Sequence, residues 1–110
     1  MTGEKVQMTT TTLKTVAEII ADIEAYIRNN GGGYKGWYAG VASDPRTRLF
    51  SDHSVNEKGD AWIFRDCGTD TAARKVEDYF LAKGCDGDTG GGDRSTKYVY
   101  AYKANGHTRR

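Results

Sequence analysis

Residues 36–53 have the sequence GWYAGVASDPRTRLFSDH, in which a strand pattern passes directly into the start of a helix. Side chains alternate between the two faces of a strand, so Tyr38 would lie on the face opposite Trp37. A Ser-Asp-Pro sequence follows, and it is typical of a helix N-terminus because Ser or Asp caps the first turn and proline suits its first position. We therefore expect a strand over residues 36–42 and a helix over about residues 45–53.

Two longer segments, residues 12–30 and 71–83, have the periodicity of amphipathic helices. The apolar stripe of the first consists of Leu13, Val16, Ile20, Ile23 and Ile27, widened by Ile19 and Tyr26. That of the second consists of Ala72, Ala73, Val76, Tyr79 and Phe80. Thr15 and Glu18 fit a capping box at the start of the first helix. The first stripe is interpreted as a face packed on the protein's own sheet, and the alternative is a helix that drives dimerisation.

Two further segments, residues 61–66 and 96–104, have strand patterns. The predicted fold is therefore α+β, with a small three-stranded, mostly antiparallel sheet packed with three helices. Residues 1–11 are expected to be a flexible lead-in, residues 12–104 a single domain with its core over 36–104, and residues 105–110 a frayed basic tail.

Composition excludes several classes of protein. The chain has 110 residues and a formal charge of +1, so it is not a strongly basic nucleic-acid binder of the histone kind. Mean hydropathy is −0.70, and no apolar run is long enough to span a membrane. Cys67 and Cys85 are too few for a disulfide framework, so we expect free thiols and a cytoplasmic location.

Two other segments carry possible functions. The loop over residues 84–95 is rich in Gly and Asp, and we interpret it as a connector with a possible role in covering a pocket. The segment from Arg94 to the end has basic residues, no acid, and alternating tyrosines. This pattern suits single-stranded nucleic acid or a nucleotide, because rings stack on bases and cations bind phosphates. The alternative is a half-buried strand whose tyrosines pack under a helix.

The order and spacing of several residues resemble the second half of a GIY-YIG nuclease domain, over roughly residues 36–82. Tyr38-Ala39-Gly40 corresponds to the tripeptide that ends a strand, and Arg48 lies ten residues past the tyrosine on the next helix. Glu77 lies on a later helix, four residues after Ala73. His53 follows one residue later than is common in the family.

The resemblance implies a small endonuclease that cleaves phosphodiester bonds with Mg²⁺. Tyr38 would activate water, Arg48 would bind the phosphate, Glu77 would bind the metal, and His53 would assist. Nucleic acid or a nucleotide would be the partner. The predicted substrate-binding residues are Arg46, Lys97, Tyr98 and Tyr100.

The family's first strand, with its Gly-Ile-Tyr tripeptide, has no counterpart before residue 36. The last strand, with Tyr98 or Tyr100, is the candidate for that place in the sheet, as in a rearranged domain. An alternative function is a non-catalytic relative that binds a nucleotide or nucleic acid. Such a protein would suit a phage or mobile element, for example as an inhibitor of a host defence system. A homodimer or another protein partner is also possible.

Overall fold

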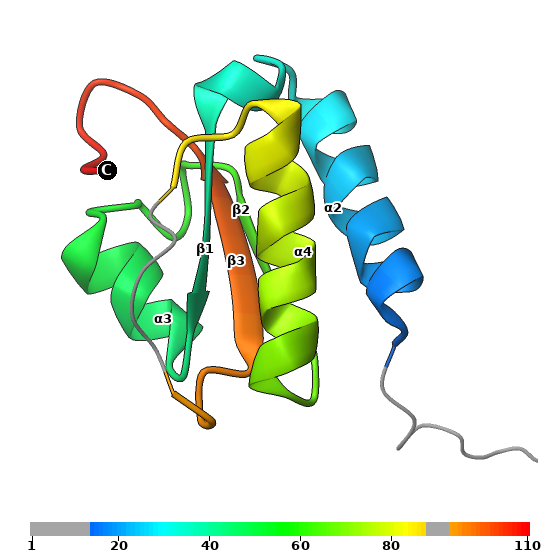
Figure 1. The fold of residues 1–110 in the computed structure, drawn as a ribbon. Helices are drawn as coiled ribbons and strands as arrows, with labels where there is room; N and C mark the ends of the chain where they lie inside the picture. Colours follow the sequence, from blue (N-terminus) through cyan, green and yellow to red (C-terminus); the bar gives the residue numbers. More distant parts are fainter. Residues whose placement is uncertain (1–13, 88–92) are drawn as a thin grey trace, which may run out of the picture.

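The computed structural model describes residues 14–87 and 93–110, in which helices and strands alternate along the chain (Figure 1). The elements are α2 (Val16–Asn30), η2 (Tyr34–Gly36), β1 (Trp37–Ala42), α3 (Pro45–Thr47), η3 (Arg48–Asp52), β2 (Trp62–Asp66), α4 (Asp70–Lys83) and β3 (Tyr98–Lys103). Each strand lies inside the range that the sequence predicts.

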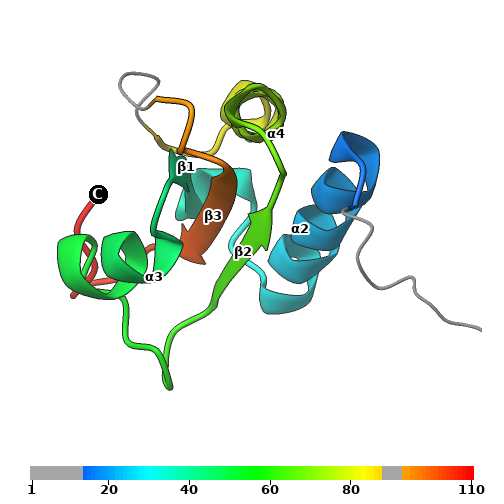
Figure 2. The same ribbon diagram turned by 90° about the horizontal axis from the view of Figure 1, so that it is seen from below.

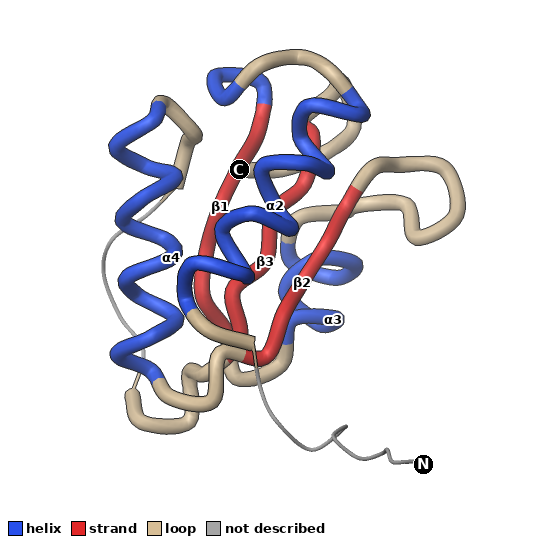
Figure 3. Tube along the Cα trace, turned by 90° about the vertical axis from the view of Figure 1, so that its right-hand side faces the viewer, coloured by secondary structure: helices blue, strands red, loops and turns tan. Residues whose placement is uncertain are grey.

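The three strands form one antiparallel sheet in the order β1-β3-β2, so the last strand in the sequence is the central one (Figure 3). In the register of β3, Tyr100 is opposite Gly40 of β1 and Phe64 of β2. This sheet, with the helices packed against it, confirms the predicted α+β fold class. It also brings residues 36–42 beside residues 96–104, which are far apart in the sequence.

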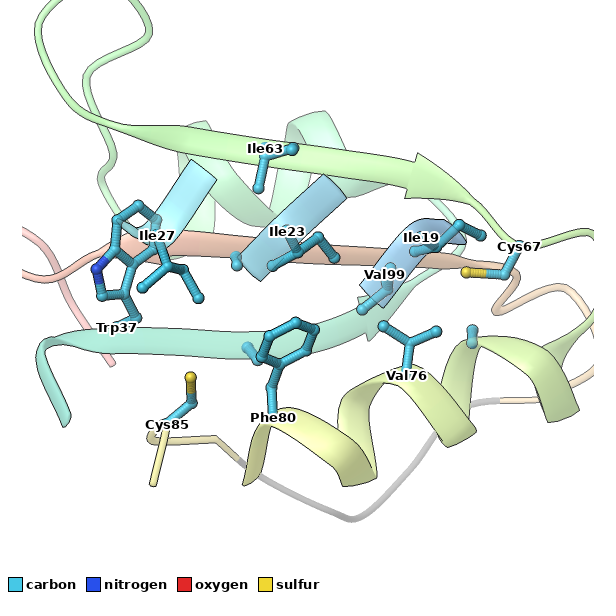
Figure 4. Close-up of a cluster of buried hydrophobic side chains, with 13 residues drawn as sticks. Ile19, Ile23, Ile27, Trp37, Ile63, Cys67, Val76, Phe80, Cys85 and Val99 are labelled. Atoms are coloured by element: carbon cyan, nitrogen blue, oxygen red, sulfur yellow. The ribbon is translucent and has the colours of Figure 1, made fainter. Parts of the chain in front are cut away.

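One face of the sheet is covered by α2 and α4, and the main hydrophobic core lies between them and the strands (Figures 2 and 4). The residues of α2 that are buried there are Ile19, Ile23 and Ile27. Ile20 is only partly buried, so Ile19 rather than Ile20 belongs to the buried centre of the stripe. Leu13 lies outside the described residues. Because this face packs on the protein's own sheet, it is not available to drive dimerisation.

The opposite face of the sheet is covered by α3 and η3 (Figure 2). A second cluster lies there, and its buried members are Tyr38, Ala42, Leu49, Val55, Tyr100 and Tyr102. The sheet is thus apolar on its α2–α4 face and lined with tyrosines on its other face. This second face carries most of the residues that the sequence singles out.

The helices α2 and α3 begin at the predicted caps, and α4 begins at a threonine cap. Thr15 and Glu18 form the capping box of α2, with Glu18 N donating to Thr15 Oγ1 at 3.1 Å. Asp44 accepts from the Thr47 backbone at 3.2 Å, and Pro45 takes the first position of α3. Thr69 accepts from Ala72 N at 3.0 Å at the start of α4.

The helix predicted over 45–53 is not a continuous α-helix. After α3 the chain forms η3, a five-residue π-helix, and His53 N donates to Arg48 O at 2.9 Å across five residues. A π turn holds one residue more than an α turn and is often found at functional sites. It therefore changes which side chains this segment presents to the sheet.

The C-terminal segment, residues 104–110, is held against the domain, so the prediction of a frayed tail is wrong. In Figure 1 it turns back from the end of β3. Ala104 N donates to Gly36 O at 2.8 Å, and Arg109 N donates to His53 O at 2.7 Å. Asp60 contacts His107 at 2.6 Å. The residues around Gly106 have the composition of a loose end. The sequence pattern could not show their partners, because those partners come from distant parts of the chain.

The outer edge of β1 is covered by the start of the Gly/Asp loop. Asp86 forms a bridge with Tyr38, in which Ala39 N donates to Asp86 O at 2.9 Å and Asp86 N donates to Trp37 O at 2.9 Å. Residues 88–92, the centre of the loop predicted over 84–95, lie outside the described residues.

Both cysteines are free and buried. Burial raises the pKa of each thiol to about 11, so neither is a reactive thiolate near neutral pH. Over residues 14–87 and 93–110, no helix has the length and apolar character needed to cross a membrane.

Candidate functional site

Tyr38 is the centre of an aromatic cluster on the α3–η3 side of the sheet. Its ring is nearly parallel to those of two β3 residues, with centroids 5.3 Å from Tyr102 and 6.2 Å from Tyr100. The His53 ring lies 4.5 Å from Tyr38 by centroid. Strands β1 and β3 and the end of η3 thus bring four rings from three segments together.

Gly40 makes room for Tyr100. A Cβ atom at position 40 would lie 2.6 Å from the Tyr100 hydroxyl oxygen and 2.7 Å from Cζ. The absence of a side chain therefore allows the phenol ring of the central strand to cross over β1. Burial raises the pKa of Tyr100, although the neighbouring Arg48 partly opposes this shift, so the hydroxyl remains protonated and can donate a hydrogen bond.

His53 is buried and bonded on both sides of its ring. Nδ1 lies 2.5 Å from the carbonyl oxygen of Arg109, which can only accept, so Nδ1 carries the proton. Nε2 lies 2.8 Å from the Tyr100 hydroxyl and therefore accepts its hydrogen. Burial, together with the Arg48 cation, lowers the pKa of His53, which keeps the ring neutral and able to take up a proton.

Arg48 is the first residue of η3 and directs a cation toward this cluster. Its Nε lies 3.4 Å from Asp52 Oδ2, and the guanidinium also interacts with the Tyr100 hydroxyl and with Tyr38. Burial lowers the pKa of Arg48, but the interactions with Tyr100, Asp52 and Tyr38 outweigh it and the net pKa is raised. The side chain is 46% exposed, so a ligand in solution can reach it.

Glu77 is enclosed by the fold rather than exposed on the surface of α4. It is 1% exposed and lies on the same face of α4 as Ala73 and Phe80, which are both buried. It is close enough to Tyr100 to affect the ionisation of that phenol. Glu77 is therefore not a surface acid.

A pocket of about 450 Å³ opens beside this cluster. Its lining residues are Tyr38, Arg48, Asp52, His53, Asp86, Gly87 and Arg110. Three of the four predicted catalytic residues, Tyr38, Arg48 and His53, thus line one hollow. The fourth, Glu77, is buried and does not line the pocket, although its charge affects the ionisation of Tyr100. The arrangement places the cation of Arg48, which can bind a phosphate, beside the hydrogen-bonded Tyr100–His53 pair.

The predicted substrate-binding residues divide between two places. Tyr100 belongs to the cluster beside the pocket, whereas Arg46 and Tyr98 lie on a neighbouring surface. This surface carries a row of partly exposed rings, Phe50, Trp62, Phe64 and Tyr98, each in contact with the next. The Arg46 guanidinium lies 5.1 Å from the centroid of Phe50, and it also pairs with Glu57. Lys97 is exposed beside Tyr98.

Several residues at the site were not among the predicted site residues: Asp52, Asp86, Gly87, Tyr102 and Arg110. The alternation of tyrosines in β3 is a signal for Tyr102, because residues 100 and 102 must share a face. Arg110 belongs to the basic segment from Arg94 to the end, but no local pattern places it or Asp86 at the site. Their side chains meet at the pocket, with Arg110 Nη1 2.8 Å from Asp86 Oδ2, only because the C-terminal segment folds back.

The donors at the site suit some metal ions better than others. Within the described part of the chain, no group of three or more His, Cys, Asp or Glu side chains is arranged to hold a metal ion. A zinc site of the structural type therefore does not fit. Mg²⁺ often binds through one or two carboxylates, with waters and substrate phosphates as further ligands. The carboxylates that line the pocket are those of Asp52 and Asp86, whereas Glu77 is buried and does not line it.

Comparisons of the chain with models of protein families, with characterised proteins and with solved structures found no match.

Proposed function

We propose that the protein is a small GIY-YIG-like endonuclease that cleaves phosphodiester bonds with Mg²⁺. The observation that carries this proposal is the meeting of Tyr38, Arg48 and His53 around one pocket, with Glu77 behind it. These residues are spread over a strand, a π-helix and a distant α-helix. A buried carboxylate is costly in so small a domain, and such groups are concentrated at functional sites.

The π-helix η3 supports the proposed resemblance. His53 follows Arg48 one residue later than is common in the family, and a π turn accommodates one extra residue. His53 can therefore occupy the position that the preceding residue would take on an α-helix. The one-residue difference in the sequence and the unusual helix thus compensate for each other.

The arrangement of the sheet also supports it. Strand β3 pairs with β1 along its whole length, and it places Tyr100 beside Tyr38. This is the arrangement expected if the last strand takes the place of the family's missing first strand. The chain would then be a rearranged version of the domain, in which that strand follows the others in the sequence.

The chain's own residues have distinct roles in the proposed reaction. Arg48 binds the phosphate oxygens, because a guanidinium can form two parallel hydrogen bonds to them. Neutral His53 accepts a hydrogen bond from the Tyr100 hydroxyl, which fixes the position of that phenol, and the hydroxyl of Tyr38 orients the attacking water. Glu77 would hold Mg²⁺, which when bound lowers the pKa of water and stabilises negative charge. Because Glu77 is 1% exposed, the surrounding residues must move apart for an ion to enter.

The proposed substrate is nucleic acid that passes from the pocket toward the row of rings formed by Phe50, Trp62, Phe64 and Tyr98. Aromatic faces stack on bases of any sequence, and Arg46 and Lys97 provide cations beside that row.

Plasmid nicking tests the proposal. Supercoiled plasmid is incubated with the protein and Mg²⁺, and relaxed product is measured on a gel. We expect EDTA and Glu77→Gln to abolish nicking and Arg48→Ala to slow it by about 100-fold, as for loss of one charge-stabilising group. Asp78→Asn is the matched control, because this neighbouring acid on α4 is exposed. Nicking that persists in Glu77→Gln, or its absence from the unmodified protein, would contradict the proposal.

A second candidate function is binding without cleavage, and the enclosure of Glu77 favours it. The pocket would then hold a phosphate-bearing ligand through Arg48 with no metal. Binding in EDTA separates the two functions. A non-catalytic protein would retain its affinity in Glu77→Gln, lose affinity in Arg48→Ala or at higher salt, and show no nicking under any condition.

A further inference from the structure

The C-terminal segment, residues 104–110, is fixed beside the pocket by contacts with distant residues. Asn105 Nδ2 donates to Asp60 Oδ1 at 2.9 Å, and His107 Nε2 lies 2.6 Å from the other oxygen of the same carboxylate. The carbonyl of Arg109 accepts from Tyr102 Oη at 2.9 Å. The same carbonyl oxygen of Arg109 also accepts a hydrogen bond from His53 Nδ1. Together these contacts set the position of the backbone at residue 109.

This fixed backbone delivers the side chain of Arg110 to the pocket. Arg110 lines the pocket together with Arg48, Tyr38 and His53. The guanidinium groups of Arg48 and Arg110, which are far apart in the sequence, therefore border the same pocket. The basic residues of the site are thus not confined to the segment that resembles the nuclease family.

The ion pair with Asp86 does not prevent Arg110 from binding a ligand. The Nη1–Oδ2 distance is 2.8 Å, but the two side chains are 44% and 46% exposed. Ion pairs this exposed contribute little to stability, so a phosphate can replace the carboxylate at small cost. The pair keeps the guanidinium near the pocket while no ligand is bound. The Arg110 cation also lowers the pKa of Asp86, so the carboxylate is charged near neutral pH.

We propose that Arg110 is a second phosphate-binding residue of the pocket, placed there by the folded-back C-terminal segment. Its ligand is a phosphate of the nucleic-acid strand, which Arg48 contacts at another point. This inference rests on the proposed function for the identity of the ligand. It adds a residue that the family resemblance does not contain and assigns it a definite place in the basic segment from Arg94 to the end.

Arg109 provides a matched control within the same segment. It acts through its backbone carbonyl, which alanine retains, whereas Arg110 acts through its side chain. The variants Arg109→Ala and Arg110→Ala remove the same charge at adjacent positions. Arg110→Lys keeps the charge but loses the forked geometry that binds two oxygens.

The test is the affinity for a fluorescein-labelled single-stranded DNA oligonucleotide, measured by fluorescence anisotropy in EDTA. We expect Arg110→Ala to weaken binding by about tenfold, as for one charged hydrogen bond, and Arg110→Lys to weaken it less. The slope of log K against log salt should fall by about 0.7 in Arg110→Ala, because one phosphate contact is lost. Arg109→Ala should change affinity much less. Melting temperatures confirm that each variant is folded.

The other outcomes are distinct. Equal weakening by Arg109→Ala and Arg110→Ala would show a general effect of charge and overturn the proposal. Unchanged or tighter binding by Arg110→Ala would also overturn it, and tighter binding would identify the segment as a cover over the pocket. If Arg110→Ala weakens binding but no variant nicks plasmid, the Arg110 proposal stands and cleavage fails. If the unmodified protein does not bind the oligonucleotide, both fail.

Discussion

Gly40 is the residue at which the sequence pattern and the geometry of the site are most directly connected. A methyl group there would overlap the Tyr100 hydroxyl at 2.6 Å, and the Tyr100 ring is 1% exposed and enclosed by its neighbours. We expect Gly40→Ala to lower the free energy of unfolding by about 1–3 kcal/mol, as is usual for an overpacked core. It should also displace Tyr100 from His53. Urea unfolding measures the first effect.

Gly36→Ala is the control for this prediction. Nothing lies within 4 Å of a Cβ atom at that position, and the change should alter the free energy of unfolding by less than about 0.5 kcal/mol. Equal effects of the two substitutions would mean that Tyr100 moves aside without cost.

His53 should make stability depend on pH. Burial and the Arg48 cation lower its pKa below 6.5, so the unfolded chain binds a proton more readily than the folded one. Its contribution to stability is complete above the unfolded pKa of about 6.5 and is lost as the pH falls from there to the folded pKa. We expect the free energy of unfolding to decrease between about pH 7 and pH 5, and His53→Gln to flatten this decrease.

Urea titrations at several pH values provide the measurement. Carboxylates such as Asp60, whose pKa is lowered from 3.8, act in a more acidic range and do not interfere. Burial opposes that shift, but Asn56, His107 and Asn105 outweigh it. A profile of the unmodified protein that is flat over the same interval would exclude a buried neutral His53.

At the scale of elements, α4 matters because it places Glu77 behind Tyr100. Thr69 caps this helix by accepting from Ala72 N at 3.0 Å. We expect Thr69→Ala to lower the free energy of unfolding by about 1 kcal/mol through loss of that bond. Thr71→Ala, two residues later on the exposed side, should have little effect. Thermal unfolding followed by circular dichroism compares the two, and similar melting temperatures would argue against the cap.

The regular elements were predictable, and the irregular one was not. Apolar periodicity and caps gave α2 and α4 to within a few residues because both helices bury a stripe on the sheet. The π-helix η3 was missed, since five residues are too few to show a change of period. Its register depends on how Leu49 and His53 pack against β1 and β3, which is a tertiary effect.

Across the whole molecule, the sequence indicated neighbours within one segment more reliably than contacts between distant segments. Tyr38, Arg48 and His53 lie close together in the chain, and they line one pocket. The central position of β3 and the return of Arg110 to the pocket depend on contacts between distant segments. The enclosure of Glu77 likewise depends on the sheet behind α4, because a helical pattern defines a face but not the depth of what covers it.

The place of β3 in the sheet has a consequence for biosynthesis. Strands β1 and β2 do not pair with each other. Each forms its backbone hydrogen bonds with residues 98–103, which are synthesised after both strands. During translation the nascent chain can therefore form helices but not the sheet. Two aromatic strands remain without their shared neighbour until that stretch emerges, and until then the growing polypeptide is open to chaperones and proteases.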